Sequence, residues 1–230
     1  MIDFSNVKSI VIPEGEVSVI ARGAEILWRK QKYKRELAYL ESTGTQWLDA
    51  GYRINNNSEI ELVVNVLGSN NCNIFGSRPS ASNANAKNVT VTTSSTTSFC
   101  LDFTNSNYAT YRALSSPNTN NCKAKIVISK NERSVTNLDA NAVLCSNTTL
   151  CNDVFVCDTN AYVLQVSGQG FFTKTTEKAK LYSLKIAELG TLFRDFIPVL
   201  DWNDRPCMYD KVTDELFYNA GTGEFLYGTN

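Results

Sequence analysis

Short apolar runs recur along most of the chain, and several alternate apolar and polar residues with a period of two. The clearest run is Ser58–Val66, where Glu59, Glu61 and Asn65 fall on one face and the apolar residues on the other. Segments rich in Asn, Gly and Ser separate these runs at a spacing of roughly ten residues. This pattern predicts an all-β protein built as an antiparallel sandwich.

The predicted strands are short apolar runs bounded by turn signals. They are Val7–Ile12, Val17–Ile20, Glu25–Trp28, Ser58–Val66, Lys123–Ser129, Val154–Cys157, Ala161–Val166, Lys178–Glu188, Leu192–Val199, Cys207–Asp210, Leu216–Asn219 and Glu224–Tyr227. Lys34–Leu40 is the best candidate for a short helix, and it is ambiguous. Two polar stretches, Gly68–Ser98 and Thr104–Asn121, are interpreted as long loops between short strands at one rim of the sandwich.

Three parts of unequal size are expected along the 230 residues. Residues 1–30 form a small β-unit for attachment and oligomerisation, because they carry more apolar surface than so short a unit can bury. Residues 31–35 form a basic, solvated linker. Residues 36–230 form the main sandwich domain, which we expect to fold without the preceding residues.

Composition excludes several functions. The chain has no histidine, which removes Ser-His and Cys-His catalytic pairs and every histidine-ligated metal site. A formal net charge of −1 argues against a nucleic-acid binder. No apolar run is long enough for a membrane helix, so membrane insertion is not expected. The opening residues resemble no targeting segment, and we expect synthesis in a cytoplasm without secretory export.

Seven cysteines are present, at positions 72, 100, 122, 145, 151, 157 and 207. An odd number cannot pair fully within one chain, and no C-x-x-C spacing suggests a zinc site. We expect reduced, mostly buried thiols that pack as small apolar side chains. No cofactor is predicted; Ca²⁺ stays an alternative that no motif supports, because the acidic residues form no recognisable calcium loop.

Three segments together resemble a known family. They are YLESTGTQWLDAGY at 39–52, LFRDFIPV at 192–199, and the stretch from MYD at 208–210 to FYNAGTGEF at 217–225. These segments resemble the opening, a near-terminal strand and the closing hairpin of concanavalin A/laminin-G-like jelly-roll domains in bacteriophage and prophage tail proteins. Residues 7–28 resemble a short module that precedes such domains.

The resemblance implies a jelly-roll fold and a place in the virion, as a receptor-binding or baseplate protein of a phage tail made in the host bacterial cytoplasm. The expected function is non-catalytic recognition of a host-surface saccharide. The expected partners are that saccharide and other tail or virion proteins. The resemblance also favours a homo-oligomer, a trimer assembled through residues 1–30; a monomer is the alternative.

Candidate saccharide contacts come from two polar loops, because sugars are bound by aromatic rings together with amide and hydroxyl groups. One loop supplies Asn107, Tyr108, Tyr111 and Arg112, and the other supplies Trp202 and Asn203. Each residue has the alternative of an ordinary loop position. Trp202 is either an exposed stacking platform or a plug for the end of the sandwich.

Two other functions remain open. The same loops could bind virion proteins instead of sugar, in a structural baseplate or decoration protein. A glycosidase of this fold is the third candidate, but the chain lacks a strand with alternating carboxylates, and the acidic residues near 201–215 fall in turns. Gly221-Thr222-Gly223 lacks the lysine and helix of a phosphate-binding loop and is expected to form a turn.

Overall fold

The structure is a computed structural model that describes most of the chain between residues 10 and 229. The described residues are 10–12, 15–17, 19–22, 25–67, 72–80, 87–94, 98–104, 112–116, 119, 121–169 and 178–229. Every regular element among them is a β-strand, which confirms the all-β class for this part of the chain. None of these residues belongs to a helix that could span a bilayer.

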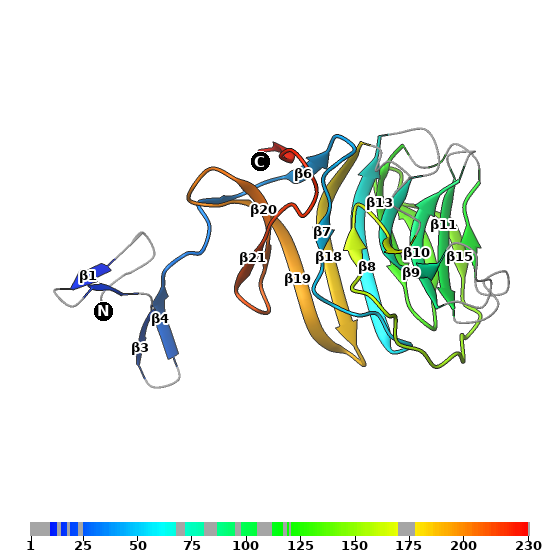
Figure 1. Ribbon diagram of the computed structural model, residues 1–230, viewed down its shortest axis with the longest axis horizontal. Coiled ribbons are helices and arrows are strands. Elements are labelled where there is room, and N and C mark those ends of the chain that lie inside the picture. The colour runs from blue at the N-terminus through cyan, green and yellow to red at the C-terminus, as the bar shows by residue number, and fades with distance from the viewer. Residues whose placement is uncertain are drawn as a thin grey trace.

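Four short strands precede the main sheets. They are β1 (Ile10–Ile12), β2 (Gly15–Val17), β3 (Val19–Arg22) and β4 (Glu25–Arg29), paired antiparallel as β1 with β2 and β3 with β4. Three strands were predicted here, but the run Val17–Ile20 is divided between β2 and β3. Figure 1 shows these strands beside the sandwich, joined to it by the segment after β4. Val7 lies outside the described residues.

One main sheet has seven strands. They are β7 (Leu48–Asp49), β9 (Asn73–Ser80), β10 (Asn88–Thr93), β11 (Phe99–Thr104), β12 (Ala113–Leu114), β16 (Tyr162–Val163) and β17 (Ser167–Gln169). Their order is β12-β11-β10-β9-β16-β7, with β17 parallel to β9 and the other pairs antiparallel.

The other main sheet has eleven strands. They are β5 (Arg35–Glu36), β6 (Tyr39–Ser42), β8 (Ser58–Val66), β13 (Lys123–Ile128), β14 (Arg133–Asn137), β15 (Ala142–Asn147), β18 (Ala179–Glu188), β19 (Thr191–Leu200), β20 (Pro206–Asp210), β21 (Glu215–Phe217) and β22 (Leu226–Gly228). Its main path is β15-β14-β13-β8-β18-β19-β20-β21, and β6 joins β18 to β22.

The two sheets enclose one apolar core, as in a sandwich (Figure 1). The predicted alternation of β8 is confirmed, because its apolar residues at positions 60, 62, 64 and 66 are all buried. Leu101 and Phe103 of β11 belong to the same core from the seven-stranded sheet. Burial of this apolar surface is the main force that holds the sheets together.

Strands β18 and β19 separate along their length, and residues 35–42 enter the space between them. Leu184 to Glu188 of β18 pair with β19, whereas Ala179 to Leu181 pair with β6. The backbone nitrogen of Leu37 donates to the Pro198 oxygen at 2.9 Å, and the Leu37 side chain is buried. Because Lys34–Leu40 supplies β5 and part of β6, the candidate helix there is wrong.

The segment predicted as a basic linker lies against the sandwich. The Lys34 nitrogen donates to the Leu200 oxygen at 2.8 Å, and Arg35 pairs with Leu200 in β5. The ring centroid of Tyr33 lies 4.9 Å from that of Tyr209. The boundaries 1–30, 31–35 and 36–230 themselves stay a prediction.

The polar stretch Gly68–Ser98 is not only rim loop, because β9 and β10 lie in it and pair within the seven-stranded sheet. These strands were not predicted, because their hydroxyl and amide residues interrupt the alternation of apolar and polar residues. Val154–Cys157, predicted as a strand, forms only an isolated bridge between Asn55 and Val156. The run Ala161–Val166 is shortened to β16, because Leu164 has a φ of 63°, outside the strand region.

Candidate functional site

An open groove of about 200 Å³ lies at the end of the larger sheet, between two stretches of chain that flank its last strands. One stretch is the turn between β19 and β20, and the other runs from the end of β21 to β22 (Figure 1). The residues that line the groove are Arg205, Pro206, Tyr218, Asn219, Gly221, Gly223, Glu224 and Phe225. The space equals about seven water molecules, enough for one sugar ring.

Asp201 organises the wall of this groove. Its carboxylate is buried, and Oδ1 accepts hydrogen bonds from the backbone nitrogens of Asn203 and Arg205, both at 2.8 Å. Oδ2 accepts from Arg205 Nε at 2.9 Å and from the Tyr218 hydroxyl at 3.0 Å. Desolvation raises the pKa of the Asp201 carboxyl, but these hydrogen bonds outweigh it, so the pKa lies below its usual value. Asp201 therefore stays ionised and fixes both neighbours.

Arg205 and Tyr218 form a stacked pair above that carboxylate. The guanidinium carbon lies 4.5 Å from the centroid of the Tyr218 ring, and Arg205 Nη2 lies 2.9 Å from Asp201 Oδ2. The Arg205 side chain is 53% exposed, so its remaining N–H groups face solvent. The pair offers hydrogen-bond donors and an aromatic ring in a fixed arrangement.

The floor of the groove is held by backbone contacts to residues 45–47. Asn219 Oδ1 accepts from the backbone nitrogens of Trp47 at 3.1 Å and Gly221 at 2.9 Å, and its Nδ2 donates to the Gly223 oxygen. A Cβ on Gly221 would lie 2.0 Å from the Thr45 oxygen. Only glycine therefore fits at position 221 without moving this floor.

Glu224 is the free charge of the groove. It is exposed, and no hydrogen bond or ion pair joins it to another of the described residues. Asn219 is committed to the floor, so the side-chain groups open to a ligand are the Arg205 guanidinium and the Glu224 carboxylate. The groove thus presents both donors and acceptors, the combination that hydroxyl-rich ligands require.

The predicted contacts Trp202 and Asn203 lie in the turn that carries Asp201 and Arg205. Trp202 is 46% exposed, and its Nε1 donates to the Gln31 oxygen at 3.0 Å, so the indole partly covers segment 31–35 and partly faces solvent. Asn203 is exposed, and its backbone nitrogen binds Asp201. Both residues flank the groove, although neither lines it.

The other predicted contacts are not brought to this groove. Arg112 binds the buried Asp102 through Nε at 2.7 Å and Nη2 at 3.1 Å, and its backbone oxygen accepts from Asn147 of β15. Five strand spacings separate β15 from β19, on the order of 24 Å. Arg112 and Trp202 therefore cannot share one small ligand. Asn107, Tyr108 and Tyr111 lie outside the described residues.

The groove residues Arg205, Tyr218 and Glu224 were not predicted as contacts. The sequence placed the acidic residues near 201 in a turn, and one signal was available there, an arginine four positions after Asp201. The pairing with Tyr218 depends on strand order across β20 and β21, which no local pattern reveals.

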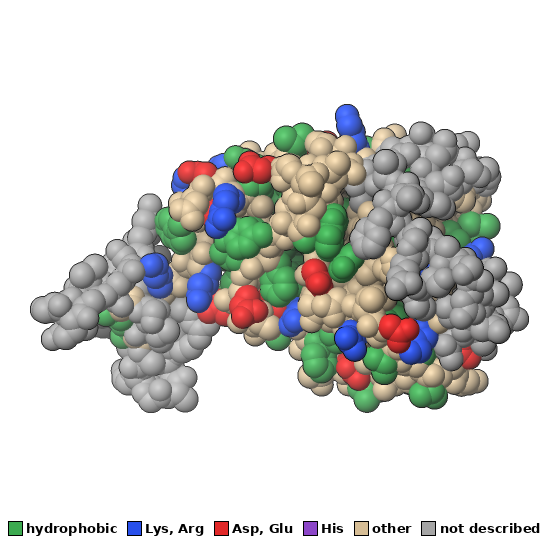
Figure 2. Space-filling view, viewed as in Figure 1, with side chains coloured by type: hydrophobic (Ala, Val, Ile, Leu, Met, Phe, Trp, Pro, Cys, Tyr) green, Lys and Arg blue, Asp and Glu red, His purple; other side chains and the backbone are tan. Residues whose placement is uncertain are grey.

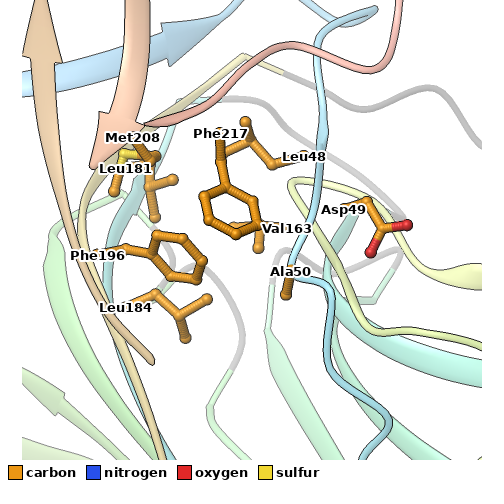
Figure 3. Close-up of a pocket in the computed structure, with 9 residues that line it drawn as sticks. All are labelled: Leu48, Asp49, Ala50, Val163, Leu181, Leu184, Phe196, Met208 and Phe217. Carbon is orange, nitrogen blue, oxygen red and sulfur yellow. The ribbon is translucent and has the colours of Figure 1, made fainter. Parts of the chain in front are cut away.

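A second space lies inside the sandwich and is apolar. Figure 3 shows Phe196, Phe217 and Leu184 turned toward one another between the sheets, with the Asp49 carboxylate pointing away. Asp49 instead accepts from the Gly51 nitrogen at 2.8 Å. The space admits no water molecule, so it is a feature of core packing.

The cysteines are free thiols, and six of the seven are buried. Burial raises the pKa of Cys157 and of Cys207 to about 12, and that of Cys100 and Cys145 to about 11. Among the described residues no group of three or more Cys, Asp or Glu side chains is placed to hold a metal ion. Figure 2 shows acidic and basic side chains interspersed on one face of the described sandwich, without a patch of one sign.

No family model matches this chain, and no curated protein matches it. What the protein does is therefore inferred from the groove and from the resemblance of its three segments.

Proposed function

We propose that this protein is a non-catalytic receptor-binding protein of a bacteriophage tail, which binds a host-surface saccharide in the groove beside Arg205 and Tyr218. The fold proposed with it is a concanavalin A/laminin-G-like jelly roll. The observation that carries the proposal is the fixed Arg205–Tyr218 pair, held by the five hydrogen bonds and ion contacts of Asp201 at the edge of an open groove.

Sugar binding suits this chemistry. Sugars present an apolar face that packs on aromatic rings and a rim of hydroxyls that need both donors and acceptors. A ring and a guanidinium that are already held in place lose little conformational entropy when a ligand arrives. Trp202 and Asn203 flank the groove and would extend the contact beyond one sugar ring.

The loop that carries Asn107, Tyr108, Tyr111 and Arg112 is proposed as a second contact region. The Asp102–Arg112 pair supports it, because a buried carboxylate fixes this guanidinium as Asp201 fixes Arg205. At that distance from the groove, the loop would contact another part of a long surface glycan.

The proposed setting is the virion, in contact with other tail proteins, with the chain assembled as a trimer through residues 1–30. Several weak sites presented together gain in overall affinity through effective concentration. Light scattering on the intact chain at tens of micromolar tests the assembly, and a mass of 25.5 kDa there would rule out the trimer.

Adsorption of the purified protein to intact host cells tests the function, with Arg205→Ala and Tyr218→Ala as variants and Arg53→Ala as an exposed control. We expect adsorption that glycan removal abolishes, that both groove variants weaken at least tenfold, and that the control preserves. No adsorption, together with stable incorporation into particles, would favour the structural virion role. Release of reducing ends from host polysaccharide would favour a glycosidase.

A further inference from the structure

We propose that the groove selects neutral saccharides with adjacent hydroxyls, which it holds between the Arg205 guanidinium and the Glu224 carboxylate, and that it rejects acidic saccharides. This inference rests on the proposed function and adds the charge class of the ligand.

The charges around the groove leave it negative. Arg205 lies 2.9 Å from Asp201 Oδ2, so the positive charge has its counter-charge within the wall. Glu224 has no counter-charge among the described residues. One unbalanced carboxylate thus lies among the lining residues, and a ligand carboxylate beside it would meet like-charge repulsion.

The unused hydrogen-bonding groups match a diol. Arg205 Nε donates to Asp201 Oδ2, and Nη2 lies 2.9 Å from the same oxygen, which leaves the Nη1 donors for oxygen acceptors. The Glu224 carboxylate has two oxygens that can accept from two neighbouring hydroxyls. A hydroxyl both donates and accepts, so it can bridge such groups, whereas a carboxylate only accepts and leaves Glu224 unsatisfied.

The groove itself has room for one ring of the saccharide, and its floor is stiff. The groove holds about 200 Å³, and its floor is tied to Thr45 and Trp47 by backbone hydrogen bonds at 3.1 Å and 2.8 Å. A floor made of backbone cannot easily widen or shift toward a different ligand. A C6 carboxylate is close in size to the alcohol it replaces, so discrimination between the two follows from charge.

The test uses a glycan array of paired members that differ only in oxidation of the C6 alcohol to a carboxylate, probed with the full chain. We expect hits among the neutral members and at least tenfold weaker binding of their acidic partners. Glu224→Gln removes the charge and keeps the shape. In this variant the affinities for the neutral and the acidic member of a pair should differ by no more than about threefold. Glu215→Gln, at an exposed carboxylate in β21, is the matched control and should leave the ratio unchanged.

The outcomes separate this inference from the proposed function. Preferential binding of acidic members, or a ratio that Glu224→Gln leaves unchanged, would overturn the charge selection while leaving saccharide binding intact. Saccharide binding that neither Glu224→Gln nor Arg205→Ala alters would overturn the groove as the site. No binding to any member would overturn the proposed function and this inference together.

Discussion

Two regions of the sandwich are held together by different kinds of contact. At one end, a set of contacts that we call the clamp joins residues 45–51 to Arg194, Asp210 and residues 217–223, and so ties β7 of the smaller sheet to β19–β21 of the larger one. In the seven-stranded sheet, by contrast, β9–β11 pair as regular antiparallel strands, and the contacts added to this ladder are side-chain pairs such as Asp102 with Arg112.

The clamp consists mainly of contacts to backbone. The Ala220 nitrogen donates to the Trp47 oxygen at 2.8 Å, and Arg194 donates to the oxygens of Ala50 at 3.0 Å and Gly51 at 2.9 Å. Backbone atoms cannot be exchanged for others by repacking, so such contacts tolerate little change in spacing. The three segments that carry the family resemblance meet here, which explains their particular sequences as requirements of the fold.

The seven-stranded sheet has polar residues buried where a half-buried sheet would face water. Thr90 and Asp102 are opposite one another in β10 and β11, and both are buried. Asn73 of β9, also buried, donates through Nδ2 to the side-chain oxygen of Gln165, between β16 and β17, at 2.9 Å. Side-chain pairs of this kind can be replaced together by other pairs, so we expect this region to tolerate compensated substitutions better than the clamp.

The largest effect is expected from Gly221→Ala in the clamp. Its new Cβ would lie 2.0 Å from the Thr45 oxygen and 2.8 Å from Trp47 Cδ1, so the hairpin must move away from residues 45–47. We expect a loss of about 3 kcal/mol in the free energy of unfolding, measured by urea denaturation.

Gly190→Ala is the control for that substitution. Gly190 has a positive φ, of 78°, but no atom lies within 4 Å of the place that a Cβ would take there, so only backbone strain of about 1 kcal/mol is expected. Equal losses for the two variants would show that the clamp has no special sensitivity to spacing.

A smaller effect is expected from Arg112→Ala in the seven-stranded sheet. The change leaves the carboxylate of Asp102 buried without its guanidinium, and we expect a loss of about 2 kcal/mol. The double variant Asp102→Asn with Arg112→Ala should recover part of this loss, because the buried charge is gone. If the double variant loses as much free energy of unfolding as the two single variants together, the proposed tolerance of compensated changes is contradicted.

The same contrast explains what the sequence could predict. Apolar alternation predicted β8 and β13 closely, because one face of each is buried and the other wet. The strands β9–β11 were obscured by Thr90, Asp102 and similar residues, whose burial depends on cover from distant chain. Trp202 and Asn203, which lie in the turn beside the groove, were predicted from the composition of that loop, whereas Arg205 and Tyr218 meet only through the pairing of β20 with β21.

The third effect concerns the core thiol of Cys157, which lies beside the seven-stranded sheet. Burial raises its pKa to about 12, above the value near 8.5 expected for an unfolded chain. The folded state therefore holds its proton more tightly, and this contribution is complete below pH 8.5 and declines as pH rises toward 12. Between pH 7.5 and pH 10 we expect the free energy of unfolding of the parent to fall by about 2 kcal/mol more than that of Cys157→Ala.

Urea denaturation at the two pH values measures this difference, and Val156→Ala serves as the control. Val156 is an exposed, non-titrating neighbour, so its replacement should leave the pH dependence unchanged. An identical alkaline loss in the parent and in Cys157→Ala would contradict the assignment of a protonated, buried thiol.

The smallest effect is expected from removal of residues 1–29. This truncation tests whether residues before segment 31–35 contribute to the stability of the sandwich. Two contacts in segment 31–35 join the N-terminal part to the sandwich: the Gln31 oxygen accepts from Trp202, and the Tyr33 ring packs on Tyr209. Without residues 1–29 the free energy of unfolding of the sandwich should lie within about 0.5 kcal/mol of that of the intact chain.

Removal of residues 1–35 is the comparison and should lower the free energy of unfolding by about 2 kcal/mol. This change also deletes Lys34, whose backbone binds Leu200 and whose Nζ binds Asp204 at 2.6 Å. If both truncated chains are as stable as the intact chain, the contacts of segment 31–35 contribute no stability. If both lose the same amount relative to the intact chain, β1–β4 stabilise the sandwich.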